Sequence, residues 1–438
     1  MRTLKLTILA LALASAFPAQ AADLTAKPGM TADQEAEFNR IKVKTEAMED
    51  NQEASGFKGL KFSGYMDPTY IYNFNKERGT FQFIVPIDKE AYGYDNGYFG
   101  TLALDVVKET DNGTKFHLTL YPKRGGGDVM GENSIVHEAS VWIPLGGLDT
   151  KFFAGQLPDW SGYEYYAPNM YKNITHNLLF DFTLPSSYTG AGIELIRGKL
   201  DLKLMLANMN SSVRNIGEHI PMFVFRGDYG MSEYWGIGFA GSAGYKTNFR
   251  SGDVNLIADP TGNTGYDTKD TLYTSAEVDL WYTRADWTFN AHVAYGSQKK
   301  AAITADPTTG DLRDATWYGA SVLGAYKFTQ RTEGVLRVDY ISNQKNGGGL
   351  LDYNFADANN GIGPDQNGGD QEKGADRYAV TAGLNYAFNS NVTFKFEYRY
   401  DGATQNVFGN KDVLSGTGTD PKYGKSNSLL GTAAVFSF

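Results

Sequence analysis

The residues able to carry out acid–base, nucleophilic or metal chemistry are few and scattered in this chain. Its five histidines lie far apart, at positions 117, 137, 176, 219 and 292. None belongs to an HExxH motif or to another metal-ligand spacing, and no Gly-x-Ser-x-Gly elbow is present. The sequence therefore predicts no catalytic residue, no metal site and no cofactor, and it indicates that the protein is not an enzyme.

Charged side chains instead recur at every second position of many short segments. Residues 391–401 are the clearest example, because three charged side chains alternate there with four aromatic ones. The charged residues are Lys395, Glu397 and Arg399, and the aromatic residues are Phe394, Phe396, Tyr398 and Tyr400. A period of two is typical of a β-strand with one polar and one apolar face. The apolar face can meet the core of a soluble sandwich or the lipid of a membrane, and the alternation alone leaves both open.

The charged residues on these polar faces are of both signs and nearly balanced. The acidic ones are Asp105, Glu138, Glu194, Asp201, Glu277, Asp279, Asp339 and Glu397, and the basic ones are Lys115, Lys203, Arg226, Arg337, Arg377, Lys395 and Arg399. If the polar faces line a lumen, these charges influence which solutes pass. The alternative is that they pair with one another and stabilise the wall.

The connections between the segments favour a barrel over a sandwich. Short links, including residues 109–113, 145–148 and 389–390, alternate strictly with long ones. The long links cover residues 75–97, 124–133, 158–186, 210–220, 246–270, 298–314, 344–375 and 402–425. Short turns at one end and long loops at the other are typical of an outer-membrane barrel. We therefore predict an all-β fold, a transmembrane antiparallel β-barrel that occupies residues 58–438 and has 16 strands.

The 16 strands are expected near residues 60–74, 98–108, 114–123, 134–143, 149–157, 187–197, 199–209, 221–228, 233–245, 271–284, 286–297, 315–328, 332–343, 376–388, 391–401 and 426–438. In the last of them, Phe436 and Phe438 share the apolar face with Leu430, Thr432 and Ala434. A terminal strand that ends on an aromatic residue resembles the signal by which the barrel-assembly machinery recognises outer-membrane proteins. We expect Phe436 and Phe438 to serve as this signal.

The first residues of the chain set the expected compartment. Arg2 and Lys5 precede the apolar run Leu6–Ala16, and Ala19-Gln20-Ala21 supplies a small-x-small cleavage site. This pattern predicts a cleaved signal peptide over residues 1–21. Without Arg2 and Lys5 the chain has 38 basic and 50 acidic residues, so its net charge of −12 argues against nucleic-acid binding.

Composition agrees with a barrel whose strands show lipid only one face. The 28 Tyr and 26 Phe are many for a chain with a mean hydropathy of −0.38. The chain has no cysteine, so its stability is expected to come from the paired backbone of the closed sheet rather than from disulfides.

Residues 22–57 differ from the rest of the chain, because they are polar and lack the period of two. Thr31 and Gln34 resemble a capping box, and Phe38 and Ile41 recur at loosely helical spacing. We predict a short periplasmic segment that is partly helical. It can be a coiled-coil or cell-wall extension, and the alternative is a linker without a function of its own, since its apolar stripe is thin.

The third long link, residues 158–186, is apolar and aromatic where the other long links are rich in Gly, Asn and Asp. Such residues are costly in water, so this loop is expected to pack against protein. Its candidate residues for a constriction are Asp159, Trp160, Tyr163, Glu164, Tyr165, Lys172 and Asp181. The alternative is that the loop packs between subunits or extends the barrel rim.

Three segments resemble the β-barrel porins of proteobacteria, and in particular an uncharacterised branch of that group. They are residues 62–75, which begin Phe-Ser-Gly-Tyr-Met-Asp-Pro, residues 154–164, and residues 174–185, which contain Thr-His-Asn-Leu-Leu-Phe-Asp-Phe. The resemblance covers most of residues 58–438. It implies an outer-membrane location and a pore, and trimeric relatives make a homotrimer plausible, but it carries no functional residue over to this chain.

A barrel of 16 strands leaves an aqueous lumen, and the third loop of general porins folds inward and narrows it. The sequence thus favours a passive diffusion channel for ions and small polar solutes, in contact with outer-membrane lipid and narrowed by residues 158–186. The runner-up is a structural or adhesive barrel whose lumen is plugged. A transporter of hydrophobic substrates is disfavoured because residues 22–57 are too polar to form an apolar hatch.

Overall fold

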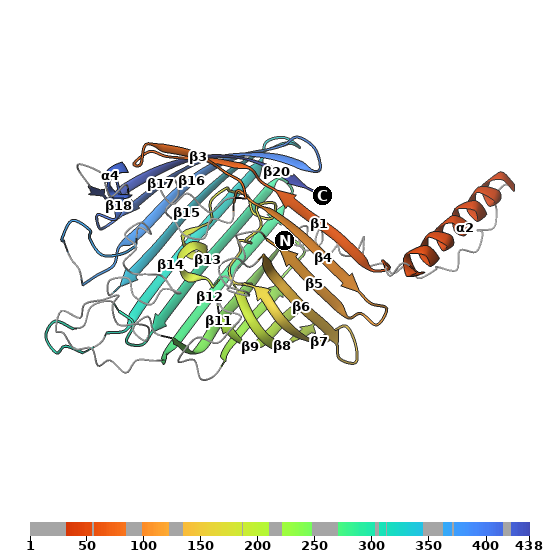
Figure 1. The fold of residues 1–438 in the computed structure, drawn as a ribbon, viewed down its shortest axis with the longest axis horizontal. Coiled ribbons are helices and arrows are strands. Elements are labelled where there is room, and N and C mark those ends of the chain that lie inside the picture. The colour runs from red at the N-terminus through yellow and green to blue at the C-terminus, as the bar shows by residue number, and fades with distance from the viewer. Residues whose placement is uncertain are drawn as a thin grey trace.

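One antiparallel sheet closes on itself into a barrel of 16 strands, with a helix outside it (Figure 1). The computed structural model describes residues 32–54, 57–84, 99–121, 135–185, 187–209, 221–247, 270–302, 306–311, 313–344, 362–369, 372–414 and 422–438. The signal peptide, His219 and most of the long links predicted from the sequence lie outside these residues.

The strands of the barrel are β1 (Leu60–Met66), β2 (Thr69–Asn73), β3 (Arg78–Gln82), β4 (Leu102–Glu109), β5 (Lys115–Leu120), β6 (Val136–Pro144), β7 (Thr150–Pro158), β8 (Ser187–Arg197), β9 (Leu200–Met209), β10 (Met222–Gly230), β11 (Trp235–Thr247), β12 (Asp270–Arg284), β13 (Trp287–Gln298), β14 (Ala315–Lys327), β15 (Thr332–Gln344), β16 (Asp376–Ala387), β17 (Val392–Ala403) and β20 (Ser426–Ser437). A ribbon of β18 (Phe408–Gly409) and β19 (Tyr423–Gly424) is separate from it. The helices are α2 (Ala32–Ala54), α3 (Leu178–Thr183) and α4 (Lys411–Leu414).

The first two strands of the barrel wall are each built from two segments. β1 and β2 are separated only by Asp67 and Pro68, and they pair with β4 and β3 respectively. The position of β3 corrects the prediction that residues 75–97 form a long loop, because the first hairpin turns at once after β2. The second strand is formed by β3 and β4, and just before β4 the backbone N–H groups of Gly100 (2.7 Å) and Thr101 (2.8 Å) donate to the Asp67 carboxylate.

The long strands show the predicted alternation of apolar and charged faces. On β15, Leu336 and Val338 are exposed, whereas Arg337 and Asp339 between them are buried. β17 repeats the pattern with exposed aromatic residues and buried charged ones. Since the exposed residues point away from the barrel, the buried charged face is the inner face of the wall.

The barrel closes where β20 pairs with β17 on one side and with β1 and β2 on the other. Gly64 and Phe438 exchange two backbone hydrogen bonds, of 3.1 and 3.0 Å. A side chain at Gly64 would clash with the Ala103 carbonyl oxygen and would lie 2.6 Å from the Phe438 ring, so the seam requires a glycine there. Phe436 and Phe438 are exposed on the outer face, as expected from the sequence.

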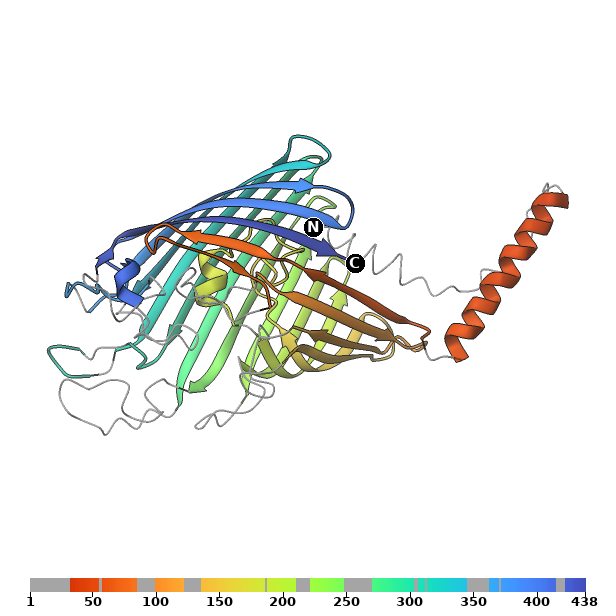
Figure 2. The same cartoon turned by 45° about the horizontal axis from the view of Figure 1, so that its top comes forward.

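The turns at one end of the barrel are short, as the sequence predicts. The link between β8 and β9 consists of Gly198 and Lys199 alone, and Gly198 has a φ of +59°, a conformation that suits a tight hairpin. The link between β12 and β13 is equally short. The link between β7 and β8 is long, and in both views its helix α3 lies inside the barrel (Figure 2).

Helix α2 confirms the helical part of the N-terminal segment and extends away from the barrel (Figure 1). Its residues are exposed from Glu35 to Ala47 with the exceptions of Phe38 and Lys42, which are half-buried. The thin apolar stripe predicted there therefore has no core to pack against within the described chain. Among the described residues, no helix has the length and apolar character needed to cross a membrane.

Candidate functional site

The loop between β7 and β8 lies against the inner face of the wall, and the short helix α3 is part of it. Asn177 begins this helix, because its side-chain oxygen accepts a hydrogen bond from the Phe180 N–H at 2.8 Å. Leu178, Leu179 and Phe182 are fully buried. The aromatic and apolar composition that marked residues 158–186 in the sequence thus corresponds to a loop packed against protein.

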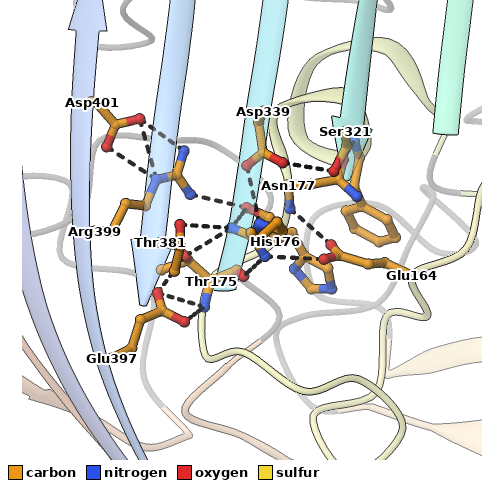
Figure 3. Close-up of polar contacts among 12 residues, drawn as sticks. Glu164, Thr175, His176, Asn177, Ser321, Asp339, Thr381, Glu397, Arg399 and Asp401 are labelled. Carbon is orange, nitrogen blue, oxygen red and sulfur yellow. Dashed lines mark hydrogen bonds and ion pairs between the residues drawn. The ribbon is translucent and has the colours of Figure 1, made fainter. Parts of the chain in front are cut away.

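Arg337 on β15 is the central anchor of the loop, and Figure 3 shows its partners Glu164, Thr175 and Asp339 close together. Its guanidinium donates to the Glu164 carboxylate at 3.0 Å and to the backbone carbonyls of Thr175 at 2.7 Å and His176 at 2.8 Å. It also pairs with Asp339 of its own strand at 3.0 Å. Arg337 and both carboxylates are buried, so each charge has its compensation within the cluster.

Two residues of β17 hold the backbone of the same loop from the neighbouring wall. The Glu397 carboxylate accepts from the N–H groups of Ile174 (2.6 Å) and Thr175 (3.2 Å) and from the Thr175 hydroxyl (2.5 Å). The Lys395 ammonium donates to the carbonyls of Pro168 (2.6 Å), Tyr171 (2.6 Å) and Asn173 (3.0 Å). The carboxylate of Glu397 thus accepts from N–H groups of the loop backbone, and the ammonium of Lys395 on the same strand face donates to its carbonyl groups.

Arg399, two residues further along β17, completes this surface. It donates to the His176 carbonyl at 2.9 Å and pairs with Asp401 at 3.0 Å. Arg377 on β16 pairs with the same Asp401 at 2.7 Å. We refer to the inner face of β15, β16 and β17 with these residues as the docked wall.

The remaining part of the loop contacts other strands. The Tyr163 hydroxyl lies 2.7 Å from the Ser321 hydroxyl of β14, which donates to Asp339 at 2.6 Å. Gly162, with a φ of +65°, passes so close to His292 of β13 that a side chain there would meet the imidazole at 2.9 Å. Lys172 pairs with Glu333 at 2.6 Å.

The aromatic residues of the loop extend its contacts to the opposite side of the barrel. Trp160 packs against Phe153 and Tyr188, with ring centroids 5.9 and 5.3 Å apart. Tyr166 lies beside Tyr121 and His137, at 5.9 and 4.1 Å. The loop therefore reaches strands on both sides of the barrel.

Burial changes the acid–base properties of the loop. It raises the pKa of the Glu164 carboxyl above its ordinary value despite the neighbouring Arg337, and it raises the pKa of Asp181 to about 7. The pKa of Asp159 is also raised to about 7, by burial and by the nearby Glu277 carboxylate. Burial lowers the pKa of His176 to about 3, so this imidazole is neutral at physiological pH.

The inner face of β4 to β9 carries charges that remain accessible to water, and we call it the open wall. The side chains of Asp105, Lys151 and Asp201 are 30%, 26% and 32% exposed. They belong to a row of pairs across the strands, in which Lys203 lies 3.3 Å from Glu194 and 2.8 Å from Asp201. Glu194 also accepts from Lys151 at 2.7 Å, so the charges alternate in sign along the row.

His117 on β5 continues this row toward the seam. Its two ring nitrogens lie 3.3 Å from Asp105 and 2.9 Å from Glu138. Lys115 on the same strand lies over the ring of Trp142, 5.3 Å from its centroid. Among the described residues, no group of three or more His, Asp or Glu side chains is arranged to hold a metal ion.

A buried cluster joins the open wall to the docked wall. Arg226 on β10 pairs with Asp228 at 2.7 Å and also with Asp279 on β12. Glu277 lies 2.7 Å from the His292 imidazole. All the charged residues predicted for the wall thus lie on its inner face, and most have partners of opposite sign.

The structure also assigns contacts to residues that the sequence analysis left out. Asp401 follows Arg399 in the period of two, so the same alternation could have identified it. His176 binds the wall through its backbone carbonyl, and Thr175 does so through its backbone N–H and carbonyl as well as its hydroxyl. No pattern of side chains marks the backbone contacts in advance. The seven loop candidates are divided, since Glu164, Tyr163 and Lys172 contact the docked side and Trp160 packs near the open wall.

Comparisons with known proteins agree on a family and a fold. The model of a family described as "Protein of unknown function (DUF3138)" matches residues 10–438. No curated protein sequence matches the chain.

Solved structures share its architecture at low sequence identity. The outer-membrane channel DcaP of Acinetobacter baumannii is 12% identical, with a TM-score of 0.52, over 86% of this chain and 97% of that one. In vitro folded OmpT of Vibrio cholerae, in a trimer form, is 14% identical with a TM-score of 0.50, over 86% and 99% of the two chains. An anion-selective porin from Comamonas acidovorans is 7% identical with a TM-score of 0.50, also over 86% and 99%. The chain therefore has the fold of outer-membrane porins.

Proposed function

The chain belongs to the DUF3138 family of proteins of unknown function, and we propose that it is an outer-membrane channel for the passive diffusion of ions and small polar solutes. The observation that carries this proposal is the open wall. Charged side chains of both signs face the interior of a 16-stranded barrel there and remain partly exposed to water. A protein that only needed a stable wall would gain nothing from leaving these charges hydrated.

The outer face of the barrel supports a position in the membrane. Its exposed residues are apolar or aromatic on successive strands, as on β15 and β17. In water such a surface would be costly, whereas lipid matches it. The signal peptide expected over residues 1–21 and the exposed Phe436 and Phe438 fit export and recognition by the barrel-assembly machinery.

The loop of residues 158–186 is proposed to narrow the lumen. It is anchored to the docked wall and reaches Tyr121 and His137 on the other side, so it crosses the interior. The passage then runs between the loop and the open wall. Glu164 and Asp181 are held in buried contacts, whereas Lys172 and Asp159 are loop charges that remain partly exposed.

A non-enzymatic role fits the same geometry. The polar groups inside the barrel are arranged in pairs of opposite charge and in bonds to the loop backbone. His117 lies between two carboxylates, and the Thr119 hydroxyl beside it donates to Asp105 at 2.5 Å, whereas it lies 3.4 Å from the imidazole Nε2. A nucleophile needs its base as the partner of its hydroxyl, and His292 is likewise paired with a carboxylate, Glu277. We therefore assign these residues to the wall rather than to catalysis.

A plugged structural barrel is the second candidate, and one observation favours it. Loop residues Leu178 and Phe182 join a buried apolar cluster with Met205, Tyr273 and Trp317 of the wall. Apolar packing inside a barrel excludes water from that part of the lumen. The two candidates differ in a single measurable property, the flow of ions through the folded protein.

Planar bilayers with the purified protein test the proposal. We expect discrete conductance steps, and a larger step when residues 163–176 are deleted, because the deletion removes the segment that crosses the lumen. Migration that changes on heating verifies that both proteins are folded barrels. A folded protein without conductance, whose deletion variant conducts, would favour the plugged barrel.

Two assembly features belong to the proposal as well. The similarity to a barrel with a trimer form makes a homotrimer a reasonable assembly, and cross-linking in native membranes would test it. Helix α2 precedes β1, at the end of the barrel with short turns, so we place residues 22–57 in the periplasm. Its exposed side chains then face the aqueous space between the membranes.

A further inference from the structure

A hollow of about 340 Å³ lies inside the barrel, between the loop and the inner face of β12 to β14. Its wall side includes Thr283, Thr288 and Asn290, and its loop side includes Tyr165. This volume falls in the range of sites that bind small molecules. No function assigned so far to the loop or the wall requires this space.

The polar groups of the wall side are available to a ligand. Within the described part of the chain, the side chains of Thr283, Thr288 and Asn290 form no hydrogen bond to protein, whereas most wall residues around them are paired. An amide and two hydroxyl groups supply both donors and acceptors without a net charge. Such a set suits a solute with several hydroxyl groups.

The charges around the hollow compensate one another. Glu164 is bound to Arg337 at 3.0 Å, and Lys172 is bound to Glu333 at 2.6 Å. The two other charged lining residues, Asp286 and Lys327, are of opposite sign. The hollow therefore has no excess charge that would select an anion or a cation.

The loop contributes an aromatic surface opposite the polar groups. The hydroxyls of Tyr163 and Tyr171 are engaged with Ser321 and the Ile174 carbonyl, both at 2.7 Å, which fixes these side chains. Tyr165 lines the same hollow and has no hydrogen-bond partner for its hydroxyl within the described chain. An aromatic face packs against the apolar face of a sugar ring, and its hydroxyl can bond to the ring substituents.

We propose that this hollow is a binding site for a neutral polyhydroxylated solute of the size of a monosaccharide. Thr288 and Asn290 bind its hydroxyl groups, and Tyr165 packs against its ring. The inference rests on the proposed channel, since it names a class of solute that enters the lumen and binds beside the loop. The chemistry excludes strongly charged solutes as the preferred ligands.

Titration calorimetry of the full chain in detergent micelles tests the site, with D-glucose, D-gluconate and D-glucosamine as probes. We expect D-glucose to bind more tightly than either charged analogue. The double variant Thr288→Val/Asn290→Ala should weaken D-glucose binding about tenfold, because it removes two neutral hydrogen-bonding groups. The control Thr274→Val, on the outer face of β12, should leave binding unchanged.

The outcomes separate the site from the channel. Conductance without D-glucose binding would contradict the proposed binding site but not the proposed channel. D-glucose binding without conductance would contradict the channel but not the site. Tighter binding of D-gluconate, or equal losses in the double variant and in Thr274→Val, would also overturn the site. Heat-modifiable migration of each variant verifies its fold.

Discussion

The docked wall and the open wall are made of the same kind of strand, yet their charged residues do different things. Both alternate outward apolar residues with inward charges. On the docked wall Arg337, Glu397 and Arg399 are buried and bind a second piece of the chain. On the open wall the side chains of Asp105 and Asp201 are 30% and 32% exposed to solvent.

The difference in burial comes from the loop that covers the docked wall, and the strands of the two walls do not differ in their alternation of side chains. A buried charge loses its hydration and needs a full set of partners, so the docked wall binds the loop strongly and specifically. A hydrated charge in a surface pair contributes little to stability and stays free to influence a passing ion. The comparison suggests that stability depends on one wall and selectivity on the other.

Removing the central anchor should give the largest effect. Arg337→Met leaves the Glu164 and Asp339 carboxylates buried without their cation, which should destabilise the docked loop by about 3–5 kcal/mol. Amide hydrogen exchange of residues 159–183 should accelerate, and the conductance step should grow. The control Lys203→Met, on the open wall, should leave exchange in the loop unchanged. Equal protection of the loop in both variants would contradict the division between the walls.

A smaller effect is expected when a single carboxylate of the docked wall is neutralised. Glu397→Gln keeps the size of the side chain but weakens its hydrogen bonds to the N–H groups of Ile174 and Thr175. We expect this change to destabilise the docked loop by about 1–3 kcal/mol. Limited proteolysis within the loop should be faster than in the natural protein. Glu194→Gln is the matched change on the open wall and should leave the rate of loop cleavage unchanged. Faster cleavage of the loop in this variant would show that the stability of the loop depends on both walls.

The open wall should respond in selectivity rather than in stability. Lys203→Gln removes a partly hydrated positive charge, so the reversal potential in a salt gradient should shift toward cation preference. Its effect on the free energy of unfolding should be below about 1 kcal/mol. The same substitution at Lys395, which binds three loop carbonyls, should instead release the loop. An unchanged reversal potential in Lys203→Gln would contradict the role of the open wall in ion selectivity.

The smallest effect concerns pH. Burial in the docked loop raises the pKa of Asp159 and Asp181 from 3.8 to about 7, so the docked state binds more protons than a released loop. Docking is then most stable below the pKa of a released loop and weakens as pH rises from about 4 to about 7. Hydrogen exchange of the loop, corrected for its intrinsic pH dependence, should show this trend. The trend should become weaker in the double variant Asp159→Asn/Asp181→Asn, which leaves Glu164 as the loop carboxyl whose pKa is raised by burial.

The strands, their inward charges and the packed loop could be predicted from the sequence, but the wall to which the loop binds could not. The alternation around Lys395 and Arg337 identified the strands and the inward charges, because the period of two is a local property of the backbone. The aromatic content of residues 158–186 indicated a packed loop. Which wall it binds depends on contacts between distant segments, such as Thr175 with Glu397, and these leave no local trace.

The broken second strand was missed for a related reason. Residues 78–82 contain a single aromatic residue and no alternation, so nothing marked β3 as a strand. Its pairing with β2 forms the strand instead. The N–H groups of Gly100 and Thr101 that bind Asp67 are again backbone groups, which the pattern of side chains does not reveal.

The seam at Gly64 and Phe438 has a consequence for the time course of assembly. The first strand is synthesised and exported long before its final neighbour, so it must wait with one edge unpaired until the last residues arrive. The loop waits as well, since its anchors on β15 and β17 lie 162 and 222 residues later in the chain. Closure of the wall and docking of the loop are therefore both late events, and a chain that stopped before β15 would have neither.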